Sequence, residues 1–105
     1  MTILQGDAYH IPVEILAEGQ PVDDTLFDEV EITLGSLRKT MSAGEISYDR
    51  EAKAFLFPIT QQESFALPSG TAEAQARVKP KDTQRVIGVS LGTVEVAYGR
   101  SRAVL

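Results

Sequence analysis

The sequence predicts an all-β domain, an antiparallel β-sandwich of about seven to nine short strands with one helical turn near residues 60–65. Three observations predict this fold. Apolar residues recur at every second position in several segments, as in strands that bury one face. Glycine, proline and charged residues interrupt these segments at short intervals. The length of 105 residues suits a single domain over the whole of 1–105.

The first strand is predicted over residues 9–16, where apolar side chains alternate with polar ones. Pro12 has no N–H to donate, so this strand is expected either at the edge of a sheet or with the Pro12 nitrogen facing away from a partner strand. A turn at 18–21 and an acidic connection at 23–28 follow, and the next strand is predicted over 30–34.

Short strands and turns continue through the middle of the chain. Strands are predicted over 37–41 and 45–48, with turns at 42–44 and 49–53 between and after them. The most apolar stretch, 54–59, is aromatic and predicts a buried strand. We expect the aromatic core to consist of Phe55, Phe57 and Phe65.

Residues 60–63 match a capping box, in which Thr60 and Glu63 satisfy each other's backbone amides. One helical turn is expected there, ending near residues 67–70. The next segment, 71–79, contains good helix formers, so propensity alone favours a helix. Its apolar residues nevertheless fall on every second position, which favours a strand. The strand is our prediction.

After a turn at 80–83, two further strands are predicted over 85–91 and 93–98, separated by Gly92. Gly88 and Gly92 lack the surroundings of a phosphate-binding loop. They are expected to mark a bend or a β-bulge.

The composition excludes several classes of protein. The absence of cysteine excludes disulfides, thiolate zinc sites and a cysteine nucleophile. A net charge of -5 argues against nucleic-acid binding, and no apolar run is long enough to cross a membrane. Before Arg38 there are eight acidic residues and no basic one, whereas ten basic and seven acidic residues follow, so charge is polarised along the chain.

No catalytic or cofactor-binding site emerges from the sequence. His10 is the single histidine and is expected on the surface, without a catalytic partner. The serines lack a nucleophile elbow. Four acids are candidate calcium ligands, but no calcium-binding loop motif surrounds them, and a solvated loop is the expectation. These acids are Asp23, Asp24, Asp28 and Glu29. We therefore predict a protein that is not an enzyme and holds no cofactor or metal.

The segment Gln5-Gly6-Asp7-Ala8-Tyr9-His10-Ile11-Pro12-Val13, followed by Gly19-Gln20-Pro21-Val22-Asp23, resembles the start of the immunoglobulin-like N-terminal domain of phage baseplate upper proteins. Three later segments strengthen the resemblance, and they are 44–49, 57–65 and 74–79. The resemblance implies an immunoglobulin-like sandwich that contacts neighbouring virion proteins in a tail or baseplate. Members of the family continue into further modules whereas this sequence ends at Leu105, so an accessory or decoration protein is an equal expectation.

Two groups of residues are interface candidates. Gln75, Arg77 and Lys79 are expected on one face of a sheet with Glu73, as a polar stripe that either pairs with another subunit or is an ordinary solvated face. Arg100 and Arg102 either reach an acidic neighbour or neutralise the N-terminal acids of the same molecule.

The leading functional hypothesis is a phage or prophage virion structural protein, made in the host cytoplasm and then incorporated in the virion. Its partners would be other virion proteins or copies of itself, with no nucleic acid and no membrane, and the polarised charge makes a homo-oligomer a specific expectation. The alternative is a small ligand- or carbohydrate-binding β-sandwich. Such sites usually expose flat aromatic rings, and the sequence offers only Tyr9, Tyr48 and Tyr98 without tryptophan.

Overall fold

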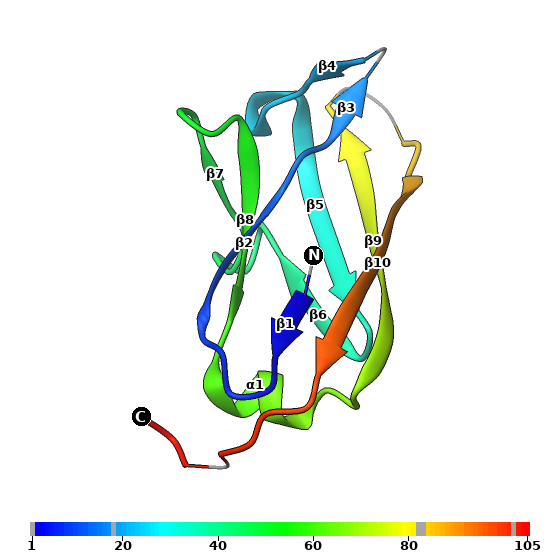
Figure 1. Cartoon of the computed structure of the whole chain (residues 1–105). Helices are drawn as coiled ribbons and strands as arrows, with labels where there is room; N and C mark the ends of the chain where they lie inside the picture. Colours follow the sequence, from blue (N-terminus) through cyan, green and yellow to red (C-terminus); the bar gives the residue numbers. More distant parts are fainter. Residues whose placement is uncertain (1, 18, 82–83, 102) are drawn as a thin grey trace.

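The computed structural model describes residues 2–17, 19–81, 84–101 and 103–105. Two β-sheets lie face to face, with a small hairpin at one end and a helix at the opposite end (Figure 1). One sheet has the strand order β1-β10-β9-β5-β6, and the other has the order β2-β8-β7. The strands of the two sheets are β1 Thr2–Leu4, β2 Tyr9–Val13, β5 Phe27–Leu34, β6 Leu37–Thr40, β7 Ser47–Asp49, β8 Ala54–Ile59, β9 Gly70–Pro80 and β10 Ile87–Ala97.

The predicted all-β sandwich is confirmed. Among the described residues every strand pair is antiparallel except one, in which β1 runs parallel to β10. The described part of the chain holds ten strands because the turn predicted at 18–21 lies within a hairpin of two-residue strands, β3 Leu16–Ala17 and β4 Gln20–Pro21. Glu18, the first residue of that predicted turn, lies outside the described residues.

The core fills the space between the two sheets. Phe55 and Phe57 on β8 are 0% and 1% exposed, as predicted, and they belong to one apolar cluster with Val30 and Ile32 of β5. The strand prediction for 71–79 is confirmed by β9, in which Ala76 and Val78 are buried while Gln75 and Arg77 are exposed. Burial on one face of the sheet therefore outweighs helix propensity in this segment.

The predicted helical turn is α1, Gln61–Ala66, and its capping box is present. The Thr60 side chain accepts from the Glu63 N–H at 3.1 Å, and the Glu63 carboxylate accepts from the Thr60 N–H at 2.9 Å. Ser64 is fully buried, and its hydroxyl ties the helix to the turn after β1 through the Asp7 carbonyl, 2.8 Å away.

Two sequence-based expectations were wrong in detail, and one strand was missed. Residues 85–91 and 93–98 do not form two strands, because β10 runs continuously through Gly92 with a register shift between Ser90 and Gly92. The predicted bulge is present at Gly92, which has φ +90° beside the register shift, but not at Gly88, which pairs with Arg77 in regular register. Phe65 is only partly buried and lies outside the core, against Gly6. The strand β1 was not predicted at all.

The edge position predicted from Pro12 is confirmed. In the three-stranded sheet β2 pairs with β8 alone, and Pro12 lies opposite Leu56 with its ring exposed. The acidic connection is shorter than expected, since a 3-10 helix spans Asp24–Leu26 and β5 begins at Phe27. The turn predicted at 80–83 includes Asp82 and Thr83, which lie outside the described residues.

Candidate interaction face

The outer face of the five-stranded sheet carries the polar stripe predicted from the sequence. On β9 the side chains of Glu73, Gln75 and Arg77 are exposed and Lys79 is half-buried. Alternation along the strand places them opposite the side of β9 that enters the core. The structure therefore brings together three of the predicted interface residues, Gln75, Arg77 and Lys79, on one rigid surface.

Cross-strand pairing adds two residues to this surface that the sequence did not indicate. Glu31 on β5 lies directly opposite Arg77, and Arg38 reaches it from β6. The Arg38 Nε lies 2.6 Å from Glu31 Oε2, and the Arg77 Nη1 lies 3.7 Å from Glu31 Oε1. The arginine side chains remain 64% and 63% exposed, whereas the shared carboxylate is 14% exposed.

A shallow hollow of about 270 Å³ lies over this cluster and also includes Lys79 and Glu29. Burial raises the pKa of Glu29, but hydrogen bonds from Ser42 and from the Val30 N–H outweigh it and hold the pKa below 4.5. Glu29 is thus ionised at neutral pH. The hollow then contains two carboxylates and the three cations of Arg38, Arg77 and Lys79, so its local charge is positive although the whole chain is acidic.

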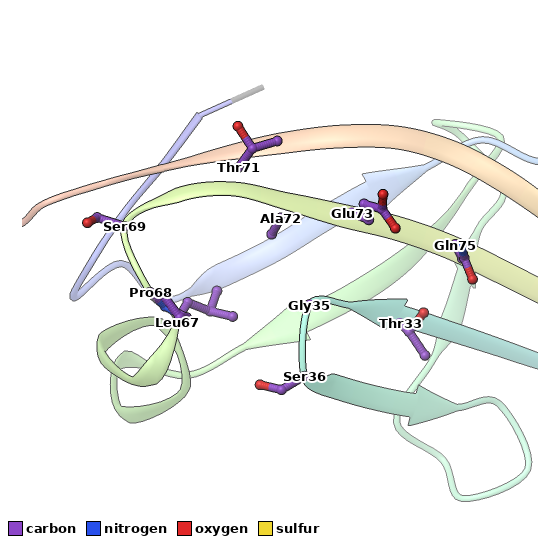
Figure 2. A pocket seen from close by; sticks show the side chains of 10 residues that line it. All are labelled: Thr33, Gly35, Ser36, Leu67, Pro68, Ser69, Thr71, Ala72, Glu73 and Gln75. Carbon is purple, nitrogen blue, oxygen red and sulfur yellow. The ribbon is translucent and has the colours of Figure 1, made fainter.

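A second hollow, of about 450 Å³, lies further along the same sheet where the β5–β6 turn meets the start of β9 (Figure 2). Figure 2 shows Thr33, Glu73 and Gln75 on neighbouring strands and Ser36 on the turn between β5 and β6. Hydroxyl, amide and carboxylate groups line it, with Leu67 and Pro68 at one end. Its lining contains no aromatic ring.

The other predicted interface residues do not join the face. Arg100 follows the C-terminal end of β10, and β10 pairs with the first residues of β9 at that end and with Val78 at the other. Arg100 is therefore at the opposite end of the sheet from Arg77, beside a hollow near Phe65 and Tyr98. Arg102 lies outside the described residues.

Acidic and basic residues that are separated along the sequence lie next to each other in the folded structure. The early acids Asp23 and Asp24 approach Arg50, at 3.8 Å and 2.9 Å, and Glu31 approaches the two arginines described above. Glu31 meets the arginines because β5 lies between β6 and β9, which carry later, basic segments. The polarised charge along the sequence therefore gives no support to the expected homo-oligomer.

No group of three or more histidine, cysteine, aspartate or glutamate side chains is placed to hold a metal ion among the described residues. The candidate calcium ligands have separate hydrogen-bond partners. Asp24 accepts from Arg50, and Glu29 accepts from Ser42. His10 lies exposed on the edge strand β2. Within the described ranges no helix is long and apolar enough to span a bilayer.

Comparisons with protein-family models, with curated proteins and with solved structures found no match to this chain.

Proposed function

We propose that the protein is a structural component of a phage or prophage virion, associated with the tail or baseplate, and that it acts through protein–protein contacts without turnover. The proposed contact surface is supported by one observation, a pair of exposed arginines that share the single carboxylate of Glu31. The virion context is supported by the resemblance of residues 5–23 and the three later segments to the baseplate family.

The chemistry of the pair suits an acidic partner. A guanidinium has five N–H donors, and one carboxylate with two oxygens cannot accept hydrogen bonds from all the donors of two arginines. The Arg77 contact to Glu31, at 3.7 Å, is an ion pair without a hydrogen bond. Arg38 and Arg77 thus retain donors toward solvent, where a carboxylate of a neighbouring protein would accept them in the bidentate manner typical of arginine.

The surrounding sheet provides the rigidity that such a contact needs. Arg77 lies on β9, which is hydrogen-bonded to a strand on each side. Its position is therefore fixed by two ladders and by the buried Ala76 and Val78 on either side of it in the sequence. A surface held in this way binds without reorganising its backbone, which lowers the entropic cost of association.

The test is incorporation into particles. Arg77→Glu and Arg38→Glu, introduced into the strain that produces the phage, should each lower the amount of the protein in purified particles by about fivefold or more, because they place a carboxylate opposite an acidic partner. Arg50→Glu is the matched control, since Arg50 is 63% exposed and pairs with Asp24 away from this face. It should leave incorporation unchanged.

Two results would contradict the proposal. Equal incorporation of all three variants would show that the arginine pair is not the contact surface. Absence of the wild-type protein from purified particles would end the virion assignment.

The ligand-binding alternative finds less support. The hollow of Figure 2 has the hydroxyl groups that a sugar would need but no ring for it to stack on. Tyr48 already packs edge-on against Phe55, with ring centroids 4.9 Å apart, and Arg50 lies over its ring, 5.5 Å from the centroid. We expect a glycan array to give no specific binding.

A further inference from the structure

Strand β10 is hydrogen-bonded along only part of one edge. Toward the centre of its sheet it pairs with β9 from Ile87 to Val96. On the other side it pairs with β1, and only over Glu95–Ala97. In the described part of the chain, residues 87–94 therefore form an open edge of the five-stranded sheet, and Figure 1 shows β1 beside the C-terminal end of β10.

The strand pairing shows which backbone groups lie at this open edge. The Glu73 carbonyl points toward β5, where it accepts from the Gly35 N–H at 3.0 Å. Backbone groups alternate in direction along a strand, so the residues of β10 opposite Glu73, Gln75 and Arg77 direct theirs away from β9. These residues are Thr93, Ser90 and Gly88. Their N–H and C=O groups can therefore pair with a further strand.

The other edge strands carry residues that oppose strand addition. Pro12 lies on β2, Arg38 lies on β6 and Asp49 lies on β7. Proline and charge on an edge strand are common means of preventing such pairing. Residues 87–94 contain neither, and the register shift before Gly92 twists this edge only locally.

The layer beneath the open edge is apolar and incompletely filled. A hollow of about 300 Å³ lies between β2 and β10 and is lined by Leu91 and Val94 of β10. A second hollow, of about 670 Å³, is lined by Ile87 and Val89 and by the exposed Leu16 of the β3–β4 hairpin. Exposed apolar surface that is gathered in this way is typical of a contact site.

Strand β1 shows what kind of segment this edge accepts. It is an extended segment from the other end of the chain, and it pairs with β10 in line with the open stretch. Its central residue, Ile3, is fully buried in the core, whereas Thr2 and Leu4 are exposed. A strand added to this edge therefore places alternate side chains in the layer between the sheets.

The open edge and the hollows together select an extended peptide as the ligand. An alkyl chain would fill the hollows, but it would cover the backbone groups of Gly88, Ser90 and Thr93 without giving them hydrogen-bond partners, which is costly. A polypeptide strand supplies both backbone groups for the edge and side chains for the hollows.

Charges at the rims of the hollows indicate the flanking residues of such a peptide. Glu14 lines the smaller hollow and Lys81 lines the larger one, and both are exposed. Neither has an ion-pair partner among the described residues. A basic residue near Glu14 and an acidic residue near Lys81 would complement them.

We propose that residues 87–93 of β10 bind an extended segment of a partner protein as an additional strand of the five-stranded sheet. Apolar side chains at alternate positions of that segment enter the two hollows, and a basic and an acidic residue flank them. The inference rests on the proposed function in taking a protein as the partner. It concerns a different surface, because β10 and the Arg38-bearing strand β6 lie toward opposite edges of the sheet.

NMR titration of the isotope-labelled chain with synthetic peptides tests this surface. Each peptide alternates threonine and valine over about seven residues, with a lysine at one end and a glutamate at the other. Two versions with exchanged ends allow the charges to match in either direction of pairing. We expect the tighter version to bind with a Kd of about 10–500 μM and to shift the amide signals of Gly88, Ser90 and Thr93 most. Proline at the centre of the peptide should weaken binding at least about tenfold.

Two substitutions in the chain test the backbone and the charge separately. Ser90→Pro removes one N–H at the open edge and should raise Kd about tenfold, whereas the matched control Ser90→Ala keeps this N–H and should leave Kd unchanged. Lys81→Glu should raise Kd about threefold, and a peptide with lysine in place of its glutamate should restore binding to this variant. Lys53→Glu is the matched control for charge, since Lys53 is exposed in the turn between β7 and β8 of the other sheet.

No binding of either peptide up to about 2 mM would overturn the proposal. Unchanged binding by a folded Ser90→Pro variant would do the same, as would equal effects of Lys81→Glu and Lys53→Glu. Because these titrations use the isolated chain and defined peptides, their failure leaves particle incorporation and the arginine pair standing. Absence of the chain from particles would in turn leave the peptide titrations unaffected.

Discussion

The contact between Lys39 and Glu63 yields the sharpest stability prediction. Lys39 on β6 is 8% exposed, and its Nζ donates to Glu63 Oε1 at 2.8 Å while lying 5.7 Å from the Phe57 ring centroid. Glu63 also closes the capping box of α1, so this ion pair connects the helix to the edge of the five-stranded sheet. An ammonium so far removed from water requires its partner.

We work the magnitude for Lys39→Met, which keeps the apolar stem and removes the charge. A hydrogen bond between charged groups contributes about 1.5–3 kcal/mol, and Glu63, with 29% of its side chain exposed, recovers part of this from water. The cation–π contact contributes about 0.5–1 kcal/mol. Relief of the buried ammonium's desolvation offsets some of both. The expected net loss in the free energy of unfolding is about 1–2 kcal/mol.

Urea unfolding followed by far-ultraviolet circular dichroism measures this loss, and a double-mutant cycle with Glu63→Gln isolates the pair. We expect a coupling energy of about 1–2 kcal/mol. Arg38→Met is the matched control on the neighbouring residue, since the Arg38 side chain is 64% exposed and should cost less than about 0.5 kcal/mol. Additivity of the two changes within about 0.3 kcal/mol would refute the reasoning.

Three further predictions concern the same sandwich. Phe57→Ala should cost about 3–5 kcal/mol, a large part of a typical domain stability, and a cooperative variant of wild-type stability in urea would show that Phe57 is not a core residue. Gly99→Ala should cost about 1–3 kcal/mol because its Cβ would lie 2.2 Å from the Gln5 carbonyl oxygen, and an unchanged melting temperature would contradict this. Burial alone would raise the pKa of Glu63, but the hydrogen bonds from Lys39 and Thr60 hold it below 4.5. Stability from this group should therefore be complete above about pH 4.5 and be lost as the pH falls through the folded-state pKa, and Glu63→Gln should show a smaller loss on acidification.

Local signals predicted the elements whose pattern is carried by neighbouring residues. The strand over 54–59 and the capping box at Thr60 were predicted with their observed bounds, because an apolar run and a reciprocal cap are both encoded within a few positions. The strand β9 was also predicted, from alternation against propensity. β1 has only three residues and is held by Val96 and its neighbours, more than ninety positions away, so no local pattern indicates it.

The interaction face was likewise predicted only in part, because local patterns indicate some of its residues and distant strand pairing brings the others. Alternation placed Gln75, Arg77 and Lys79 on one side of a strand, but Arg38 and Glu31 join them only through the strand order β9-β5-β6. A charge count along the chain suggested separated charges, whereas that order interleaves them. Pairing between distant strands, which a single sequence does not specify, decides both the site and its electrostatics.

The measurement that tests the central claim most directly is quantitative mass spectrometry of density-purified phage particles from the producing strain. A structural role predicts that this chain is present at a fixed ratio to a major tail protein in every preparation, and that the ratio survives washing in salt that removes adventitious protein. A chain that is absent, or whose ratio varies between preparations and falls on washing, would contradict the account.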